Sequence, residues 1–223
     1  MTLPYGLALR YGSLMAQPQV IGKTPRWWVV SKPSGMLTVP GRGNYPVLSE
    51  WARKELGPVW VVHRLDRETS GVVLLARTEN DHREACGWFQ ERKTKKVYTC
   101  LASGLPNAPI IKVNSPIEGA PSISQIEVRE TYREGFLARV VPRTGRRHQI
   151  RIHLSRSGYP LWGDVLYGGA SEIQFAKDLK IAISRVALHA SSLELPTGEK
   201  FESELSDDFR TWLDVLRKEG QNA

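Results

Sequence analysis

The stretch VWVVHRLDRETSGVVLLART, residues 59–78, indicates how the centre of the fold is built. Two apolar runs, residues 59–62 and 72–76, flank the polar segment 63–71. This pattern predicts two buried strands joined by a polar loop, because short continuous apolar runs are typical of strands inside a core. A simple turn would need only a few polar residues. The length and charge of this loop therefore suggest that it does more than reverse the chain.

The charged centre of the loop holds a carboxylate between two guanidinium groups. Asp66 is flanked by Arg64 and Arg67, which could keep the carboxylate ionised and attract a phosphate to the same place. An ionised carboxylate on a loop can serve as a nucleophile or as a general base. Alternatively, Asp66 only stabilises a turn that Thr69 helps to complete. The loop alone leaves both interpretations open.

The overall composition favours a globular protein with a polyanionic partner. The 223 residues include 31 Lys and Arg against 23 Asp and Glu, a formal net charge of +8. A basic balance favours nucleic acid, although it is also found in proteins that are simply basic. Two cysteines form no disulfide framework, and we find neither a signal peptide nor a membrane span. We therefore expect a cytoplasmic protein.

A second charged stretch is RTGRRHQIRIHLSRSG, residues 143–158, in which five arginines fall within fourteen residues. We predict a helix of about ten residues capped at Thr144, whose arginines suit phosphate groups. A solvated basic face is the alternative. Histidines could suggest a metal site, but they lack ligand spacing and acidic co-ligands, so we expect no metal. These histidines are His63, His148, His153 and His189.

The remaining pattern predicts many strands with interspersed helices. Strands are expected at residues 27–30, 36–39, 96–103 and 184–195, with a hairpin at 124–142. Helices are expected at 47–56, at 78–95 and from Ser206 to Lys218, with Ser49 and Ser206 as N-caps, and a surface loop at 105–124. Without regular β-α-β alternation, this order predicts an α+β fold with a largely antiparallel mixed sheet flanked by helices and loops. We expect an N-terminal arm at residues 1–24 and one domain at 25–219.

Six motifs in order resemble the RluA-type pseudouridine synthases. HRLDRETSG (63–71) looks like their active-site motif, and TGRRHQIRIHL (144–154) is similar to their T-G-R-x-H-Q-I-R-x-H-L motif. The other four are VVSKPSGMLTVPG (29–41), KKVYTCLASG (95–104), GYPLWGDVLYG (158–168) and RVALHASSLEL (185–195). The resemblance implies the pseudouridine-synthase catalytic fold. It is to the short form, since we expect no S4-type RNA-binding domain.

The resemblance also implies roles for individual residues. Asp66 would be the catalytic aspartate, Tyr98 would pack its ring on the target base, and Arg151 would pair with Asp66. Leu193 would wall the pocket. The residues expected to bind substrate are Arg64, Arg67, Thr69, Arg146, Arg147, His148, Gln149 and Leu193.

The implied reaction is the conversion of uridine in structured RNA to pseudouridine. The expected substrate is a stem-loop of ribosomal RNA, transfer RNA or both, and the expected enzyme is a monomer. No redox step occurs, so no cofactor is implied. An RNA-binding module without activity and a metal-assisted nuclease are the competing functions; the intact Asp66, Tyr98 and Arg151 argue against the first, and the missing acidic cluster against the second.

Overall fold

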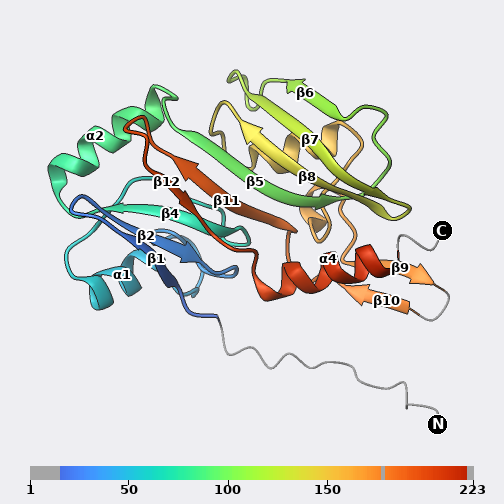
Figure 1. Cartoon of the computed structure of the whole chain (residues 1–223), viewed down its shortest axis with the longest axis horizontal. Coiled ribbons are helices and arrows are strands. Elements are labelled where there is room, and N and C mark those ends of the chain that lie inside the picture. Colours follow the sequence, from blue (N-terminus) through green and yellow to red (C-terminus); the bar gives the residue numbers. More distant parts are fainter. Residues whose placement is uncertain (1–15, 177–178, 220–223) are drawn as a thin grey trace, which may run out of the picture.

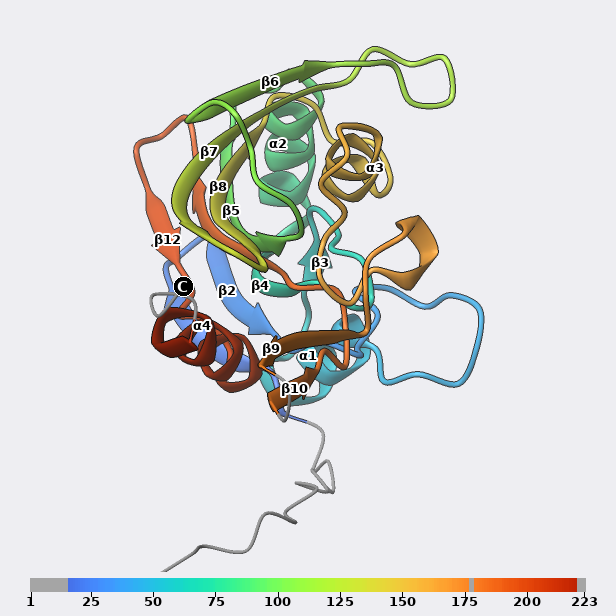
Figure 2. The ribbon, with the colours of Figure 1, turned by 90° about the vertical axis from the view of Figure 1, so that its right-hand side faces the viewer.

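The computed structural model describes residues 16–176 and 179–219, in which one large curved sheet carries the helices on its two faces (Figures 1 and 2). Its strands run in the order β1-β2-β4-β11-β5-β8-β7-β6, with β3 paired to β4 and β12 to β11. The strands of this sheet are β1 (Gln19–Lys23), β2 (Trp27–Lys32), β3 (Trp60–Val61), β4 (Ser70–Ala76), β5 (Lys95–Ala102), β6 (Ile110–Asn114), β7 (Ile123–Tyr132), β8 (Gly135–Pro142), β11 (Leu188–Glu194) and β12 (Lys200–Glu202). A separate pair is formed by β9 (Glu172–Ala176) and β10 (Leu179–Ala182).

Every pairing between the described strands is antiparallel except the one between β4 and β11 at the centre. This confirms the predicted α+β class with a largely antiparallel mixed sheet. All seven residues of β4 are buried, as its continuous apolar run predicted. Gly71 makes the β4–β11 contact possible, because a Cβ there would lie 2.2 Å from the Ala190 carbonyl oxygen.

Alternate residues of the strands face different helices, as the period of two requires. Val72 and Leu74 of β4 share a core cluster with α2, whereas Val73 and Leu75 share one with α1. On the other half of the sheet, Cys100 of β5 packs in the core cluster that includes α3. Its neighbour Leu101 packs in the core cluster that includes α4. The helices are α1 (Leu48–Leu56), α2 (Glu79–Gln90), α3 (Gln149–Arg156), α4 (Asp207–Glu219) and the short 3₁₀ helix η1 (Val165–Tyr167).

The face that carries α2 and α3 is therefore the concave side of the sheet, and both helices lie within its curve in Figure 2. Tyr98 has the same parity on β5 as Cys100 and joins the cluster of α3. The space between α2 and α3 on this face is where the candidate site lies.

Several local expectations were wrong in detail. Helix α3 begins at Gln149, after a left-handed His148, and Thr144 is not its cap. Ser49 lies inside α1, whose N-cap is Val47. The expected strand at 36–39 is reduced to a single bridge, Leu37 to Val47, and the predicted loop at 105–124 contains β6.

Helix α2 ends at Gln90, before the expected residue 95, and β11 begins at Leu188, after the expected residue 184. Helix α4 runs over Asp207–Glu219 with its predicted apolar stripe buried. Residues 1–15 of the predicted arm are not described, whereas Gln19–Lys23 pair with β2 as an edge strand. The division into an arm and a domain stays a prediction. None of the helices in the described ranges is long and apolar enough to cross a membrane.

Candidate active site

The loop that carries Asp66 connects β3 to β4 and is held through its backbone. The Leu65 carbonyl accepts a hydrogen bond from the Thr38 hydroxyl (2.9 Å), which itself accepts from the Leu65 amide (3.1 Å). The Asp66 carbonyl accepts from the Thr69 amide (3.1 Å). Such satisfied buried groups define one backbone conformation. The loop therefore presents the Asp66 side chain from a fixed support.

A buried lysine holds the next carbonyl of the loop. Lys32 is fully buried and donates to the carbonyls of Arg67 (3.2 Å), Met36 (2.8 Å) and Pro33 (2.9 Å). Burial and the nearby Arg185 lower the pKa of Lys32 to about 7, and Asp66 acts in the opposite direction. The Lys32 ammonium group thus links the K-P-S-G turn to the Asp66 loop.

Asp66 faces a cavity of about 350 Å³ between α2 and α3. Residues from both predicted motifs line the cavity, so the structure brings together segments 80 residues apart in the sequence. Of the expected site residues, those at its wall are Arg64, Asp66, Thr69, Tyr98, Arg146, Arg147, His148, Gln149 and Arg151. The volume of this cavity is large enough for a nucleobase.

One wall of this cavity is an aromatic pair. His63 stacks on Phe89 of α2, with 4.6 Å between the ring centroids, and its Nε2 accepts a hydrogen bond from the Leu74 amide (3.0 Å). Burial, with Lys96 as the second cause, lowers the pKa of His63 to about 3. His63 is therefore neutral at physiological pH and serves as a flat, uncharged wall.

Tyr98 forms part of the same cavity from strand β5. Burial and the charge of Asp66 raise the pKa of the Tyr98 hydroxyl, so it stays protonated at physiological pH. Within the described ranges, that hydroxyl makes no hydrogen bond with another residue. Tyr98 thus presents both a ring and an uncommitted hydroxyl to whatever enters the cavity.

The direct ion pair expected between Arg151 and Asp66 is wrong. Arg151 instead forms a bidentate pair with Asp164, from Nε to Oδ2 and from Nη2 to Oδ1, both at 2.7 Å. Both side chains are buried, with exposed fractions of 6% and 0%. Burial acts to lower the pKa of Arg151, but its hydrogen bonds to Asp164 and the nearby Asp66 raise it above its usual value. Arg151 thus contributes a fixed positive charge near Asp66 without touching it.

His148 is the basic group nearest to Asp66 among the described residues. Its Nε2 lies 3.7 Å from Asp66 Oδ1, and its Nδ1 is 2.9 Å from the Tyr167 hydroxyl. The residue has a left-handed backbone, φ +53°, which is uncommon outside glycine and typical of functional positions. Burial lowers the pKa of His148, while Asp66 opposes this and Arg151 adds to it.

Gln149 lines the cavity, but its amide is committed to the protein. Its Oε1 accepts from the Thr144 hydroxyl (2.6 Å) and the Arg146 amide (3.0 Å), and its Nε2 donates to the Ile123 carbonyl (2.9 Å) and to Ser124 Oγ (3.0 Å). All four contacts hold the residues before α3 against β7. Gln149 therefore positions the arginine-rich turn instead of offering free donors.

The expectation that Leu193 walls the pocket is wrong. Leu193 is buried in a core cluster beneath Trp88 and Phe89 of α2, and the β11 side chain at the cavity is Leu188. Other wall residues that we did not predict are His63, Phe89 and Lys96. The stretch HRLD contained His63 next to the predicted site, whereas the sequence pattern gave no signal for Phe89.

A second cavity, of about 560 Å³, adjoins the first at Asp66, and Arg64, Arg147, His148 and Arg151 line both. Arg42 and Arg67 extend its wall, and the Arg67 guanidinium lies over the Tyr45 ring at 4.3 Å. In the part of the chain that the structure describes, no three His, Cys, Asp or Glu side chains are grouped closely enough to hold a metal ion.

The fold and this constellation define an α+β protein with one carboxylate at the junction of two arginine-lined cavities. The family model described as RNA pseudouridylate synthase matches residues 26–156, more than half of the chain. The chain belongs to this family of RNA pseudouridine synthases, as its motifs predicted. Asp66, Tyr98 and Arg151 all lie within the matched segment.

Curated relatives agree with the family. The dual-specificity RNA pseudouridine synthase RluA of Vibrio cholerae is 34% identical over 180 residues, covering 73% of this chain and 71% of that protein. The ribosomal large subunit pseudouridine synthase D of Nitrosomonas europaea is 31% identical over 221 residues, covering 85% of this chain. This chain matches 62% of the length of that synthase.

Solved structures confirm the fold. Human RNA Pseudouridylate Synthase Domain Containing 4 matches with a TM-score of 0.72 at 21% identity, covering 89% of this chain and 92% of that one. Human RNA Pseudouridylate Synthase Domain Containing 1 matches with a TM-score of 0.71 at 24% identity, covering 90% and 87%. The α+β architecture is therefore that of the pseudouridine synthases.

Proposed function

We propose that this protein converts uridine in structured RNA to pseudouridine, with Asp66 as the catalytic group. The observation that carries the proposal is the placement of Asp66. Its carboxylate lies at the junction of a cavity that can hold a base and an arginine-lined cavity, on a loop whose carbonyls from Leu65 to Glu68 all accept hydrogen bonds. A base removed from its stack could enter the first cavity while its backbone remains in the second.

The isomerisation has simple requirements. The bond between N1 and C1′ breaks, the base turns, a bond forms between C5 and C1′, and the proton on C5 is replaced by one on N1. The cavity between α2 and α3 would retain the detached base throughout. Whether Asp66 attacks the ribose, attacks the base or removes a proton, it must be ionised and unblocked, and no side-chain hydrogen bond to another described residue occupies its carboxylate.

Tyr98 and Arg151 complete the proposed catalytic set. The Tyr98 ring would pack on the uracil, and its neutral hydroxyl could take part in the proton transfer that completes the product. Arg151 would stabilise the ionised carboxylate through its charge, at a distance fixed by Asp164. These two residues therefore have separable tasks.

The second cavity supports a path for the RNA strand. Its arginines suit phosphate groups, and the exposed aliphatic side chains Val165 and Leu166 of η1 adjoin them, each 69% exposed. Unstacked bases next to the target could rest on this apolar turn. We propose that Arg64, Arg67 and Arg147 bind the flanking phosphates.

We also propose ribosomal RNA, transfer RNA or both as substrate, and a monomeric enzyme in the cytoplasm. The relatives named for the large ribosomal subunit or for dual specificity support this choice of RNA. The free thiols Cys86 and Cys100 fit a reducing compartment. Light scattering of the purified protein would test the monomer.

The test of the function is an Asp66→Asn variant assayed on RNA transcribed with tritium at C5 of uridine. Pseudouridine formation at C5 releases that tritium to water. We expect Asp66→Asn to abolish release while RNA affinity stays within about threefold, because the shape is retained and only the charge and nucleophilicity are lost. Asp207→Asn, at a highly exposed carboxylate of α4, is the matched control and should keep full activity.

Two outcomes would contradict the proposal. Residual turnover of Asp66→Asn within about tenfold of the parent would remove Asp66 from the mechanism. Strand cleavage that excess EDTA abolishes would favour the metal-assisted nuclease, whereas the proposed isomerase should remain active in EDTA when monovalent salt keeps the RNA folded.

A further inference from the structure

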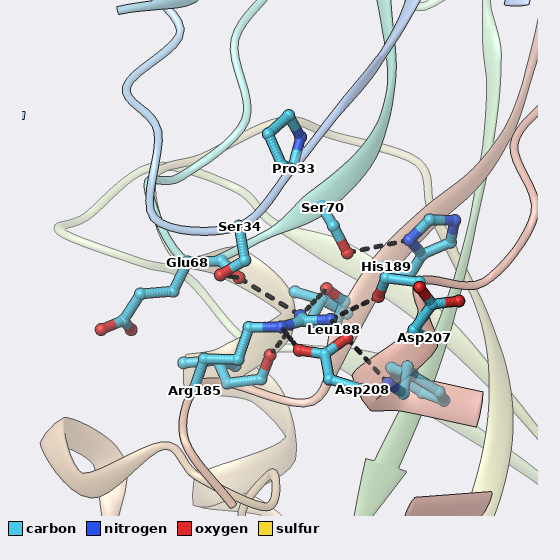
Figure 3. Close-up of polar contacts among 12 residues, drawn as sticks. Pro33, Ser34, Glu68, Ser70, Arg185, Leu188, His189, Asp207 and Asp208 are labelled. Atoms are coloured by element: carbon cyan, nitrogen blue, oxygen red, sulfur yellow. Dashed lines mark hydrogen bonds and ion pairs between the residues drawn. The ribbon is translucent and has the colours of Figure 1, made fainter. Parts of the chain in front are cut away.

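A buried arginine outside the family match connects α4 to the Asp66 loop. Arg185 is 6% exposed and precedes β11. Its Nε and Nη2 donate to both carboxylate oxygens of Asp208, at 2.6 and 2.8 Å, and Nη2 also donates to Ser206 Oγ at 2.7 Å. Asp208 and Ser206 are at the N-terminus of α4. Figure 3 shows Arg185 between Asp208 on one side and Ser34 and Glu68 on the other.

The other end of the guanidinium reaches the loop itself. Arg185 Nη1 donates to the Glu68 carbonyl at 3.4 Å, and to the carbonyls of Val186 and Leu188 at 3.0 and 3.4 Å. The Ser34 hydroxyl donates to the same Glu68 carbonyl at 2.9 Å. Two donors from distant segments therefore converge on a carbonyl two residues beyond Asp66.

The far end of the loop is held by the neighbouring strand. His189 Nε2 donates to the Ser203 carbonyl at 3.2 Å, so its Nδ1 is the acceptor for the Ser70 hydroxyl at 2.9 Å (Figure 3). Segment 185–189 thus fastens the loop at Glu68 through Arg185 and at Ser70 through His189. Contacts at the Glu68 carbonyl and at the Ser70 side chain, both shortly after Asp66 in the chain, limit the positions available to Asp66.

We propose that Arg185 is a positioning residue of the isomerisation, which holds the Glu68 carbonyl and makes the placement of Asp66 depend on the docking of α4. The inference rests on the proposed function for its effect on turnover. Its geometric part, the coupling of α4 to the loop, stands on the contacts alone. Asp208 balances the buried guanidinium, which would otherwise be costly to bury.

Helix α4 offers a matched control. Near its other end, Arg217 forms a bidentate pair with Glu130 of β7, a strand that is not part of the Asp66 loop. Removing either arginine loosens α4 at one end, but only Arg185 also touches the loop. Arg185→Gln and Arg217→Gln should therefore differ in turnover.

The experiment compares these two variants by tritium release under saturating RNA, by RNA affinity and by hydrogen exchange of the loop amides. We expect Arg185→Gln to lower kcat by about tenfold or more with RNA affinity within about threefold, since misplacement of a catalytic group affects the transition state and not ground-state binding. Arg217→Gln should keep kcat within about twofold. The amides of Leu65 and Thr69 should exchange faster in Arg185→Gln only.

The results separate the inference from the proposed function. If the parent protein makes no pseudouridine, the function fails, and exchange at residues 65–69 still tests the coupling. A folded Arg185→Gln variant with parental kcat and parental exchange would overturn the inference, as would equal losses in both variants.

A milder variant covers the case in which Arg185→Gln does not fold. Ser34→Ala removes only one donor to the Glu68 carbonyl and should lower kcat about threefold with unchanged RNA affinity. Combined with Arg185→Lys, its effect on kcat should be non-additive, because both act on one carbonyl. Parental kcat in Ser34→Ala, or strict additivity with Arg185→Lys, would contradict the inference.

Discussion

The buried pair of Arg151 and Asp164 predicts that substitutions can change stability and activity independently. The two side chains are almost inaccessible and are joined by two hydrogen bonds of 2.7 Å. Asp164→Asn or Arg151→Met would leave one charge buried without its partner, at a cost of about 3–5 kcal/mol in unfolding free energy. For a chain of this size, that loss corresponds to a fall in Tm of roughly 6–20 °C.

The double variant Arg151→Met with Asp164→Leu removes both charges. Replacing a buried ion pair by apolar groups is often neutral, so we expect its stability to return to within about 2 kcal/mol of the parent. Its turnover should remain low, because the guanidinium group at the wall of the Asp66 cavity is still missing. Urea denaturation measures the first quantity and tritium release the second.

Two results would contradict this reasoning. A loss of less than about 1 kcal/mol in unfolding free energy in the single variants would refute the stabilising role of the buried pair. A double variant that regains both stability and turnover would show that Arg151 is purely structural.

Three other predictions use the same assays. Tyr98→Phe keeps a stacking surface worth about 1–3 kcal/mol per base, so RNA affinity should hold while turnover falls; equal turnover would exclude a role for the hydroxyl. RNA affinity should fall with salt, with a log–log slope of roughly −0.7 to −0.9 per phosphate contact; a flat dependence would mean that the arginines are only a solvated face. Burial lowers the pKa of His189 to about 4, so the unfolded chain gains a proton on acidification before the native state does. Stability should therefore fall by about 2 kcal/mol from this group between pH 7 and pH 5, and His189→Gln should lack that part of the urea-measured loss.

The fold was predictable wherever burial imposed a simple pattern. Strand β4 is buried on both faces and therefore appears as an unbroken apolar run, and α4 has an apolar stripe between acidic and basic ends. Strand β6 was missed because it is an edge strand with alternate residues exposed, within a segment rich in Pro, Gly and Ser. Thr144 does not cap α3, because its hydroxyl oxygen accepts from the Ile123 amide while its hydrogen is donated to Gln149.

The charged residues of the site could be predicted from the sequence, but the residues that they contact could not. Asp66 and the turn before α3 meet as expected, because each motif carries its charges locally. The expectation for Leu193 came from the resemblance, and it fails because of the position of this residue along β11, although a register shift between Ala190 and Ser192 turns its side chain to the face of the cavity. The shift places Leu193 opposite Lys96, on the same face as Tyr98 but beneath α2. A bulge of this kind leaves no mark in the pattern of residue types.

The partner of Arg151 could not be predicted from the sequence either, and it shows how motifs far apart in the chain form one site. Arg151 and Asp164 lie in different motifs, and only the fold brings them into contact. In the same way, the K-P-S-G turn supplies Lys32 and Ser34, and the segment before β11 supplies Arg185, all to the carbonyls beside Asp66. A carboxylate and its arginines can be recognised in nine residues of sequence. The position of that carboxylate is set by backbone contacts from two remote segments, so substitutions there should alter turnover even though none of them touches the base.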